Sequence, residues 1–318
     1  MKKGIPLALA LIMALTMLTG CTAGSSTESD IEAVREAVDY IDGNGVEVDY
    51  AKALELLRPL ADAGNSYAMF ALGYMYINGY GVEQSPEKAS EWYSKAADAG
   101  NADAFFYLGV MYYGGRGVEQ SYEKALELFT KAADSGDAVA MYNLGHMYYS
   151  GEGTEQSFEM AAKWYTKSAY AGYSVAAGEL GRLYYFGEGV EQSYEKAMEL
   201  LQRAAEAGGV QAMLDIASMY YSGTGVETDY EKVFEWIQKA ADAGSAEAMR
   251  HLGGMYYDGA GVEHSIEKSV EWYTKASDAG DTEAMLKLAS IYKNGLGVEQ
   301  DMDKANEWYE KAQQGDAQ

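Results

Sequence analysis

Side chains that could perform catalysis or bind metal ions form no recognisable motif in this sequence. Its three histidines, His146, His251 and His264, show no metal-like spacing between any two of them. The chain has no Gly-x-Ser-x-Gly motif, and its single cysteine, Cys21, lies near the start. Carboxylates are abundant, but no pair of them is distinguished by its position. We therefore predict no catalytic residue, no metal site and no cofactor, and we interpret the histidines as surface or groove residues.

A Gly-x-Gly motif, which in other proteins forms phosphate-binding loops, recurs along the chain. A dinucleotide-binding fingerprint follows a β-strand and opens a helix. Here each motif instead follows a segment with helical periodicity, so we interpret it as a turn. The motif occurs at Gly43/Gly45, Gly79/Gly81, Gly115/Gly117, Gly151/Gly153, Gly187/Gly189, Gly223/Gly225, Gly259/Gly261 and Gly295/Gly297.

These turns belong to an internal repeat of 36 residues. A second glycine signal keeps the same period at Gly64, Gly100, Gly136, Gly172, Gly208, Gly244 and Gly280. A repeat of this length cannot bury its own apolar face and must stack on its neighbours. The period therefore predicts one elongated stack in place of the roughly two globular domains that the chain length alone suggests.

Each repeat has the pattern of two helices. In the block that starts at Asn65, apolar residues from Ala68 to Tyr76 lie on one helical stripe, which ends at a Gly-x-Gly turn. Ser85 is then placed as an N-cap, with Pro86 at the first helical position. A second stripe follows and includes Trp92.

Comparison of the repeats with one another indicates what each position does. All eight second helices begin after a Ser or Asp, as expected of N-caps. The five tryptophans share one position, and Leu occupies it in the other copies, so we predict that they are core residues. The position of Gly73 is always Gly or Ala, which predicts a close approach of paired helices. First-helix caps are expected at Asn65, Asn101, Asp137, Ser245 and Asp281, but not at Tyr173 or Gly209.

The repeat resembles the Sel-one-like repeat (SLR) family, which is related to tetratricopeptide repeats. The pattern that carries the resemblance is Ala-x3-Leu-Gly-x-Met-Tyr-Tyr-x-Gly-x-Gly-Val-x-Gln, then Ser or Asp, then x-Glu-Lys-Ala-x-Glu-Trp-Tyr-x-Lys-Ala-Ala-x-x-Gly. The resemblance implies an all-α, right-handed α/α superhelical solenoid of about eight helix-turn-helix repeats that serves as an adaptor or binding scaffold. We place the solenoid at 29–316, with repeats at 29–64, 65–100, 101–136, 137–172, 173–208, 209–244, 245–280 and 281–316.

The two ends of the solenoid depart from the pattern. The first repeat opens with a charged helix around Ile31–Ile41, and the last replaces a tyrosine with Lys293. We interpret both as terminal repeats that shield the stack from water. Pro59 lies inside the second helix of the first repeat, where we expect it to kink or stop that helix.

The start of the chain has the pattern of an export signal. Lys2 and Lys3 precede a short apolar run, and Leu-Thr-Gly-Cys follows. This ending resembles the lipobox of bacterial lipoproteins, which implies a signal peptide at 1–20 and a lipid on Cys21; an ordinary secretory signal is the alternative. Residues 21–28 are small and polar, so we predict a flexible tether. We expect an exported protein, lipid-anchored to the extracytoplasmic face of the bacterial cell membrane.

The net charge of −25 argues against nucleic acid as a partner. We expect a monomer that binds a protein or peptide. First helices line the concave face in related solenoids, and two positions three residues apart vary there from repeat to repeat. Neutral variation of a solvated surface explains that variability equally well. The predicted partner-binding residues are Tyr107, Asn143, His146, Glu179, Arg182, Asp215, Ser218 and His251. Tyr149, Tyr185 and Tyr257 could add contact area, although packing between repeats is the more common role of such residues.

Two functions follow from these observations. The first is a lipid-anchored extracytoplasmic scaffold that binds protein or peptide through its concave face, with cell-envelope or signalling assemblies as candidate settings. The alternative is a cell-envelope hydrolase that is β-lactamase-like or acts on peptidoglycan. Cysteine-rich members of the family have been linked to β-lactams, but they carry paired cysteines, and this chain has none after Cys21. We therefore favour the scaffold.

Overall fold

The computed structural model describes residues 27–315, and these residues form sixteen α-helices and no β-strand. The helices are α2 (Glu28–Asp42), α3 (Tyr50–Asp62), α4 (Ser66–Asn78), α5 (Pro86–Asp98), α6 (Ala102–Gly114), α7 (Tyr122–Asp134), α8 (Ala138–Ser150), α9 (Phe158–Tyr170), α10 (Ser174–Phe186), α11 (Tyr194–Glu206), α12 (Val210–Ser222), α13 (Tyr230–Asp242), α14 (Ala246–Asp258), α15 (Ile266–Asp278), α16 (Thr282–Asn294) and α17 (Met302–Gly315). None of these helices has the length and apolar run needed to span a bilayer.

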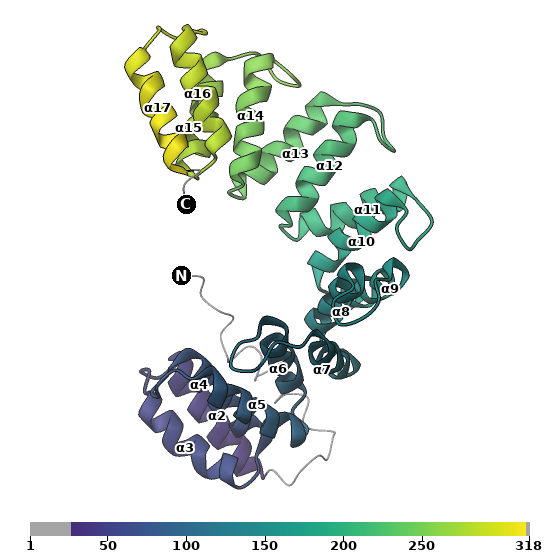
Figure 1. Cartoon of the computed structure of the whole chain (residues 1–318), viewed down its shortest axis with the longest axis vertical. Coiled ribbons are helices and arrows are strands. Elements are labelled where there is room, and N and C mark those ends of the chain that lie inside the picture. The colour runs from purple at the N-terminus through teal and green to yellow at the C-terminus, as the bar shows by residue number, and fades with distance from the viewer. Residues whose placement is uncertain (1–26, 316–318) are drawn as a thin grey trace. The chain divides into compact units, whose positions relative to one another are not determined.

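The helices stack in chain order within two compact units that divide between Gly172 and Tyr173. Unit 1 contains α2 to α9 and unit 2 contains α10 to α17 (Figure 1). In each unit every helix packs against the one before it and the one after it, and the two helices of a repeat form the most extensive contact. The predicted all-α solenoid of helix-turn-helix repeats is confirmed.

The helix boundaries follow the capping residues that the repeat comparison identified. Ser121 illustrates the second-helix cap, because its Oγ accepts a hydrogen bond from the Lys124 N–H at 3.3 Å. Asn101 illustrates the first-helix cap, with its Oδ1 accepting from Ala104 N–H at 3.0 Å. Tyr173 and Gly209 make no side-chain cap bond, as predicted. At the C-terminal end, Gly79 adopts φ 73°, a left-handed conformation that ends α4 and favours glycine.

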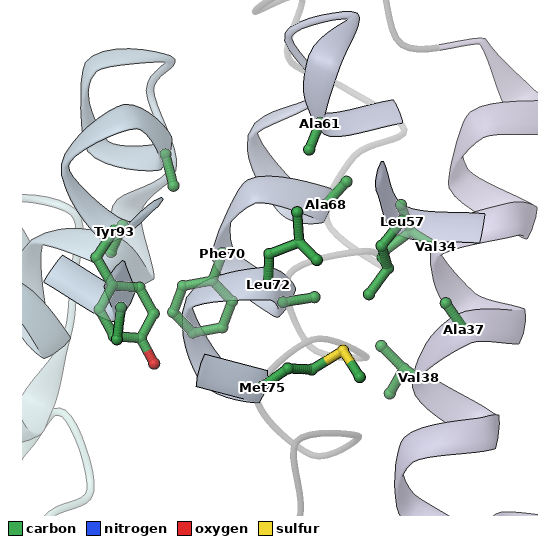
Figure 2. Packing of buried hydrophobic residues seen from close by; sticks show 14 of the residues in the cluster. Val34, Ala37, Val38, Leu57, Ala61, Ala68, Phe70, Leu72, Met75 and Tyr93 are labelled. Atoms are coloured by element: carbon green, nitrogen blue, oxygen red, sulfur yellow. The ribbon is translucent and has the colours of Figure 1, made fainter. Parts of the chain in front are cut away.

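The core of the first repeats is an apolar layer that runs between successive helices. In the first repeats Leu57, Leu72 and Met75 are almost fully buried and lie among α2, α3 and α4, with Val38 facing them (Figure 2). Phe70 continues the layer toward α5, where its ring lies 5.4 Å from that of Tyr93. First helices such as α4 are therefore buried on more than the single stripe that the periodicity indicated.

The small residue in each first helix is required by the helix paired with it. A Cβ added at Gly73 would lie 2.7 Å from the ring of Tyr93, which is 1% exposed. A Cβ at Gly109 would lie 2.9 Å from the ring of Phe129. Both distances are shorter than normal carbon contacts, so a side chain at these positions would force the helices apart. The predicted close approach is confirmed.

The tryptophans are less buried than their prediction as core residues implies. Trp164 is 9% exposed, but Trp92, Trp236, Trp272 and Trp308 are only half-buried. In each case a lysine three residues later lies over the indole ring, at 3.9 to 4.3 Å from its centre. The tryptophans therefore form the edge of the core, where the lysine covers one ring face through a cation–π contact. The neighbouring position, which holds Tyr93 or Phe129, is the fully buried one.

Two expectations near the first repeat need correction. Helix α3 continues through Pro59 to Asp62 instead of stopping there. Pro59 removes the hydrogen bond to the carbonyl of Glu55, and because both residues are exposed, water can solvate that carbonyl. Helix α2 begins at Glu28, and Thr27 and Asp30 form a capping box, so Glu28, the last residue assigned to the tether, belongs to this helix and Thr27 caps it. The predicted signal peptide and Cys21 lie outside the described residues.

Candidate functional site

Unit 2 brings together three of the predicted partner-binding residues, Glu179 and Arg182 on α10 and Asp215 on α12. Arg182 donates from Nε to Asp215 Oδ2 at 2.7 Å and from Nη2 to Oδ1 at 3.3 Å, which is a bidentate arrangement. Its Nη1 lies 3.7 Å from Glu179 Oε2. Gln211 donates from Nε2 to Asp215 Oδ1 at 3.1 Å. We call these four residues the Arg182 network.

The Arg182 network links two successive repeats at a partly exposed surface. Arg182 and Glu179 have side chains that are 34% exposed, and Asp215 is 24% exposed. An ion pair with this exposure contributes at most about 1 kcal/mol to stability. Two carboxylates surround one guanidinium, so the network keeps a net negative charge. Its guanidinium, carboxylate and amide groups are all able to form hydrogen bonds or ion pairs with a ligand.

A shallow cavity of about 190 Å³ lies against one side of this network, between α10 and α12. Its wall is mainly small, because Gly178, Ala204 and Gly208 contribute no long side chain. Glu179, Arg182 and Asp215 supply the charged part of the lining. The cavity is therefore a narrow recess next to a fixed pattern of charges.

A larger cavity of about 610 Å³ lies on the other side of Asp215, among α12, α13 and α14. We call it the α12–α14 groove. Ser218 and His251, both predicted as partner-binding residues, line it. His251 Nε2 lies 3.7 Å from Glu247 Oε1 on the same helix. The complete lining is Gln211, Leu214, Asp215, Ala217, Ser218, Tyr221, Tyr230, Val233, Ile237, Glu247, His251, Gly254, Met255, Asp258 and Ala260.

The predicted residues of unit 1 have separate local partners. Tyr107 on α6 packs its ring 5.2 Å from Phe70 and 5.6 Å from Tyr93, and burial followed by the charges of Asp103 and Asp137 raises its pKa. Its contacts are those of a packing residue.

Asn143 and His146 lie on α8, also in unit 1. Asn143 donates from Nδ2 to the carbonyl of Val139 in its own helix, at 3.0 Å. His146 Nδ1 lies 3.8 Å from Glu152 Oε2, the same oxygen that accepts the Tyr113 hydroxyl at 2.7 Å. These contacts neither confirm nor contradict a role in binding, which stays a prediction.

The tyrosines at the ends of the first helices pack mainly within their own repeat. Tyr149 lies 5.2 Å from Phe158, and Tyr185 lies 5.5 Å from Tyr194, measured between ring centres. The equivalent pair, Tyr221 and Tyr230, is the one that lines the α12–α14 groove. Tyr221, Tyr230 and Asp258 were not among the predicted partner-binding residues.

The sequence does contain a signal for this groove. Gly254 and Ala260 are the smallest residues at two positions of the repeat. Other repeats carry Tyr74, Val110, His146, Arg182, Ser218 or Ser290 at the first position and Tyr80, Arg116, Glu152, Glu188, Thr224 or Leu296 at the second. The small size of both residues leaves open space in this repeat.

No metal centre is indicated in the part of the chain that the structure describes, where histidines and carboxylates form no group of three or more suited to an ion. His264 occupies a position that is a glutamine in most other repeats. In one of them, Gln120 Nε2 donates a hydrogen bond to the Tyr113 carbonyl at 2.8 Å and so connects the turn to the end of the first helix. The interpretation of His264 as a surface or groove residue stays a prediction.

Comparison with known proteins identifies the repeats. Eight segments match the model of the Sel1 repeat, at residues 40–65, 66–101, 102–137, 138–173, 174–209, 210–245, 246–281 and 282–312. The predicted repeat boundaries differ from these by one residue in most copies. In the first copy the match begins at residue 40, which leaves most of α2 outside it.

Two solved structures are similar over most of the chain. One is c5321, a protective antigen present in uropathogenic Escherichia coli strains that displays an SLR fold; it is 29% identical, with a TM-score of 0.79 over 96% of this chain. This chain spans 64% of the length of that protein. The other is a Sel1 repeat protein from Oxalobacter formigenes, 32% identical, with a TM-score of 0.68 over 77% of this chain and 99% of that one. A comparison with curated proteins gave no match.

Proposed function

Because this chain belongs to the Sel1 repeat family, whose helical repeats commonly bind other proteins, we propose that it is a binding scaffold anchored by lipid to the extracytoplasmic face of a bacterial cell membrane. The observation that carries the binding role is the pair of adjoining cavities in unit 2, which share Gln211 and Asp215. A polar network beside an apolar groove is typical of a recognition surface. The Leu-Thr-Gly-Cys21 sequence supports the anchor.

The binding role is tested by removing the Arg182 network as a set. Glu179, Arg182 and Asp215 are changed together to Ala, because removal of only one partner would leave an uncompensated charge. The tagged full chain is expressed in its native cells, crosslinked and purified, and its partners are identified by mass spectrometry. We expect the variant to lose at least one partner that the wild type captures. The matched control changes Glu199, Arg203 and Glu206, exposed residues of α11 with the same charges, and should keep that partner.

An unchanged partner profile in the Glu179, Arg182 and Asp215 variant would contradict binding at this surface. Turnover of nitrocefin or peptidoglycan by the purified protein would instead support the envelope hydrolase. The same cells test the anchor, because Cys21→Ser should move the protein from the membrane fraction to the soluble fraction. A Cys21→Ser protein that stays in the membrane fraction would contradict lipid attachment at this residue.

A further inference from the structure

We propose that the α12–α14 groove binds a basic peptide segment, which places an apolar side chain against Ile237 and Met255 and a neighbouring Lys or Arg beside Asp258. The proposal rests on the proposed binding function and specifies the chemistry of the partner. Its volume of about 610 Å³ falls within the range of about 300–1,000 Å³ that is typical of ligand pockets.

The groove lies where one repeat carries the smallest residues found at two positions of the repeat, Gly254 and Ala260. Between repeats 102–137 and 138–173, Tyr113 donates its hydroxyl to Glu152 at 2.7 Å, which holds the tyrosine against the next turn. The equivalent residues at the groove are Tyr221 and Ala260, and Ala260 has no oxygen in its side chain to accept such a bond. Tyr221 is accordingly 63% exposed.

The floor of the groove is apolar and its edge is aromatic. Val233, Ile237 and Met255 are 6%, 5% and 9% exposed, so they form a rigid floor that belongs to the core. Tyr221 and Tyr230 stand at the edge with ring centres 5.8 Å apart and planes at 81°. Exposed tyrosines beside a packed apolar floor offer a large contact area at a low cost in side-chain entropy. An apolar side chain of a partner therefore fits this surface.

The charge of the lining selects a basic partner over an acidic one. Asp215, Glu247 and Asp258 line the groove, and His251 is the one basic residue among the lining residues. Asp215 is engaged by Arg182, and Glu247 lies 3.7 Å from His251. Asp258 is exposed and ends α14, where the helix dipole adds partial negative charge. A cation is therefore favoured at this end.

The net charge of the chain supports the same choice. A chain with a net charge of −25 attracts basic peptide segments and raises the rate at which they encounter it. A second copy of this chain carries the same −25, and anionic lipid headgroups are also repelled. A basic peptide is the occupant that satisfies both the apolar floor and the acidic edge.

The test uses the full chain with Cys21→Ser and three fluorescein-labelled peptides on one Gly-Ser background. One peptide carries Leu next to Lys, one carries Ser next to Lys, and one carries Leu next to Glu. Fluorescence anisotropy at physiological salt should show the Leu-Lys peptide binding about tenfold more tightly than either of the others. Equal binding of the three peptides, or binding of none, would overturn the proposal.

Two variants locate the binding. Gly254→Val fills the groove with a side chain that α6 carries at the same position, Val110, and a Cβ at Gly254 approaches only the Tyr273 hydroxyl, at 3.6 Å. It should weaken binding of the Leu-Lys peptide about tenfold. Asp258→Asn, at an exposed position, should weaken the same peptide and reduce the salt dependence of its binding. Ser290→Val and Asp278→Asn, which lie outside the groove, are the matched controls and should change neither quantity.

The failure of this inference differs from a failure of the proposed function. If Gly254→Val and Asp258→Asn both fold normally by circular dichroism and leave peptide affinity unchanged, the inference is wrong. Partner capture in cells that still depends on Glu179, Arg182 and Asp215 would then leave the proposed function standing. A captured partner whose crosslinked segment is acidic would likewise overturn the inference alone.

Discussion

Asp103 on α6 is a carboxyl group that the fold partly buries and that is affected by the charge of Asp137. Its side chain is half-buried, and burial followed by the charge of Asp137 raises its pKa from 3.8 to about 6. Glu283 holds the same position in another repeat, where Arg250 Nη1 lies 3.3 Å from its Oε2. The residue equivalent to Arg250 is Phe70 in the repeat before Asp103. The same backbone position therefore carries an ion-paired carboxylate in unit 2. In unit 1 it carries a carboxylate whose ionised form is destabilised by burial.

This difference predicts that Asp103→Asn stabilises the protein at neutral pH. The folded-state pKa of Asp103 lies above its unfolded value, so the stability that its protonated form contributes is present below pH 3.8 and is lost as the pH rises through about 6. At pH 7.5 the substitution should raise the free energy of unfolding by on the order of 1 kcal/mol, an amount reduced by partial exposure. At pH 3.5 the wild type and the variant should be nearly equal. Urea denaturation at both pH values measures this.

The control for this prediction is Asp134→Asn, since Asp134 is exposed near the end of α7. It should leave the difference between the two pH values as in the wild type. An Asp103→Asn variant that is less stable than the wild type at pH 7.5 would show that the carboxylate makes a favourable interaction in the fold.

The residues that the sequence predicts well are those whose partners lie a few positions away. Ser85 and the other caps were predicted because a cap bonds a backbone N–H two or three residues on. Arg182 and Asp215 were predicted as partner-binding residues, but their ion pair was not. It joins residues on two first helices, and its existence depends on how repeats stack, which no local pattern encodes.

At the scale of the helix, α6 contains two glycines with opposite predicted effects. Gly109→Ala should destabilise unit 1 by about 1–3 kcal/mol, because the new Cβ would lie 2.9 Å from the Phe129 ring. Gly114→Ala should be stabilising by about 0.5–1 kcal/mol, because nothing lies within 4 Å of its Cβ and alanine favours the helix. Thermal melts of the two variants measure this difference.

A second change checks the reason for the effect at Gly109. Repeat 210–245 carries Ala217 and Ile237 at the positions of Gly109 and Phe129. The Gly109→Ala and Phe129→Leu double variant should therefore be more stable than the sum of the two single changes predicts, because the smaller side chain makes room for the methyl group. A double variant that is less stable than the sum of the two single changes would rule out this clash as the cause.

Helix positions and pairing were predictable because period, glycine turns and caps all agree in eight copies. The α12–α14 groove was not predicted, although its small residues are visible in the sequence. Its volume depends on which side chains of α13 reach the space, and Val233 and Ile237 pack into the core beneath it. Pattern analysis identifies a missing side chain but not whether a neighbour moves in to replace it.

At the scale of the whole molecule, each helix contacts mainly the helices before and after it within its own unit. The free energy of unfolding of such a chain is approximately the sum of the stability of each repeat and of the interfaces between neighbouring repeats. A substitution or deletion at one end therefore affects mainly the repeats close to it. Helix α2 is the first member of unit 1 in the described chain and buries Val34, Ala37, Val38 and Ile41. It lies largely outside the matched repeats yet covers Leu57 and Met75 (Figure 2). We therefore predict that it acts as a terminal cap.

Deletion of Ile31–Ile41 tests this cap. The deletion exposes the apolar side chains of α3 and α4, so unit 1 should lose solubility and its Tm should fall by at least about 5 °C.

Hydrogen exchange followed by mass spectrometry should show faster exchange in α3 to α5 and unchanged exchange in α12 to α15, because the interfaces between neighbouring repeats do not couple repeats that far apart. The control replaces Glu32, Arg35 and Glu36, exposed residues of α2, with Ala, and should behave as the wild type. Unchanged solubility and Tm after the deletion would show that α3 and α4 need no cap, and faster exchange throughout α12 to α15 would show that stability is shared over the whole chain.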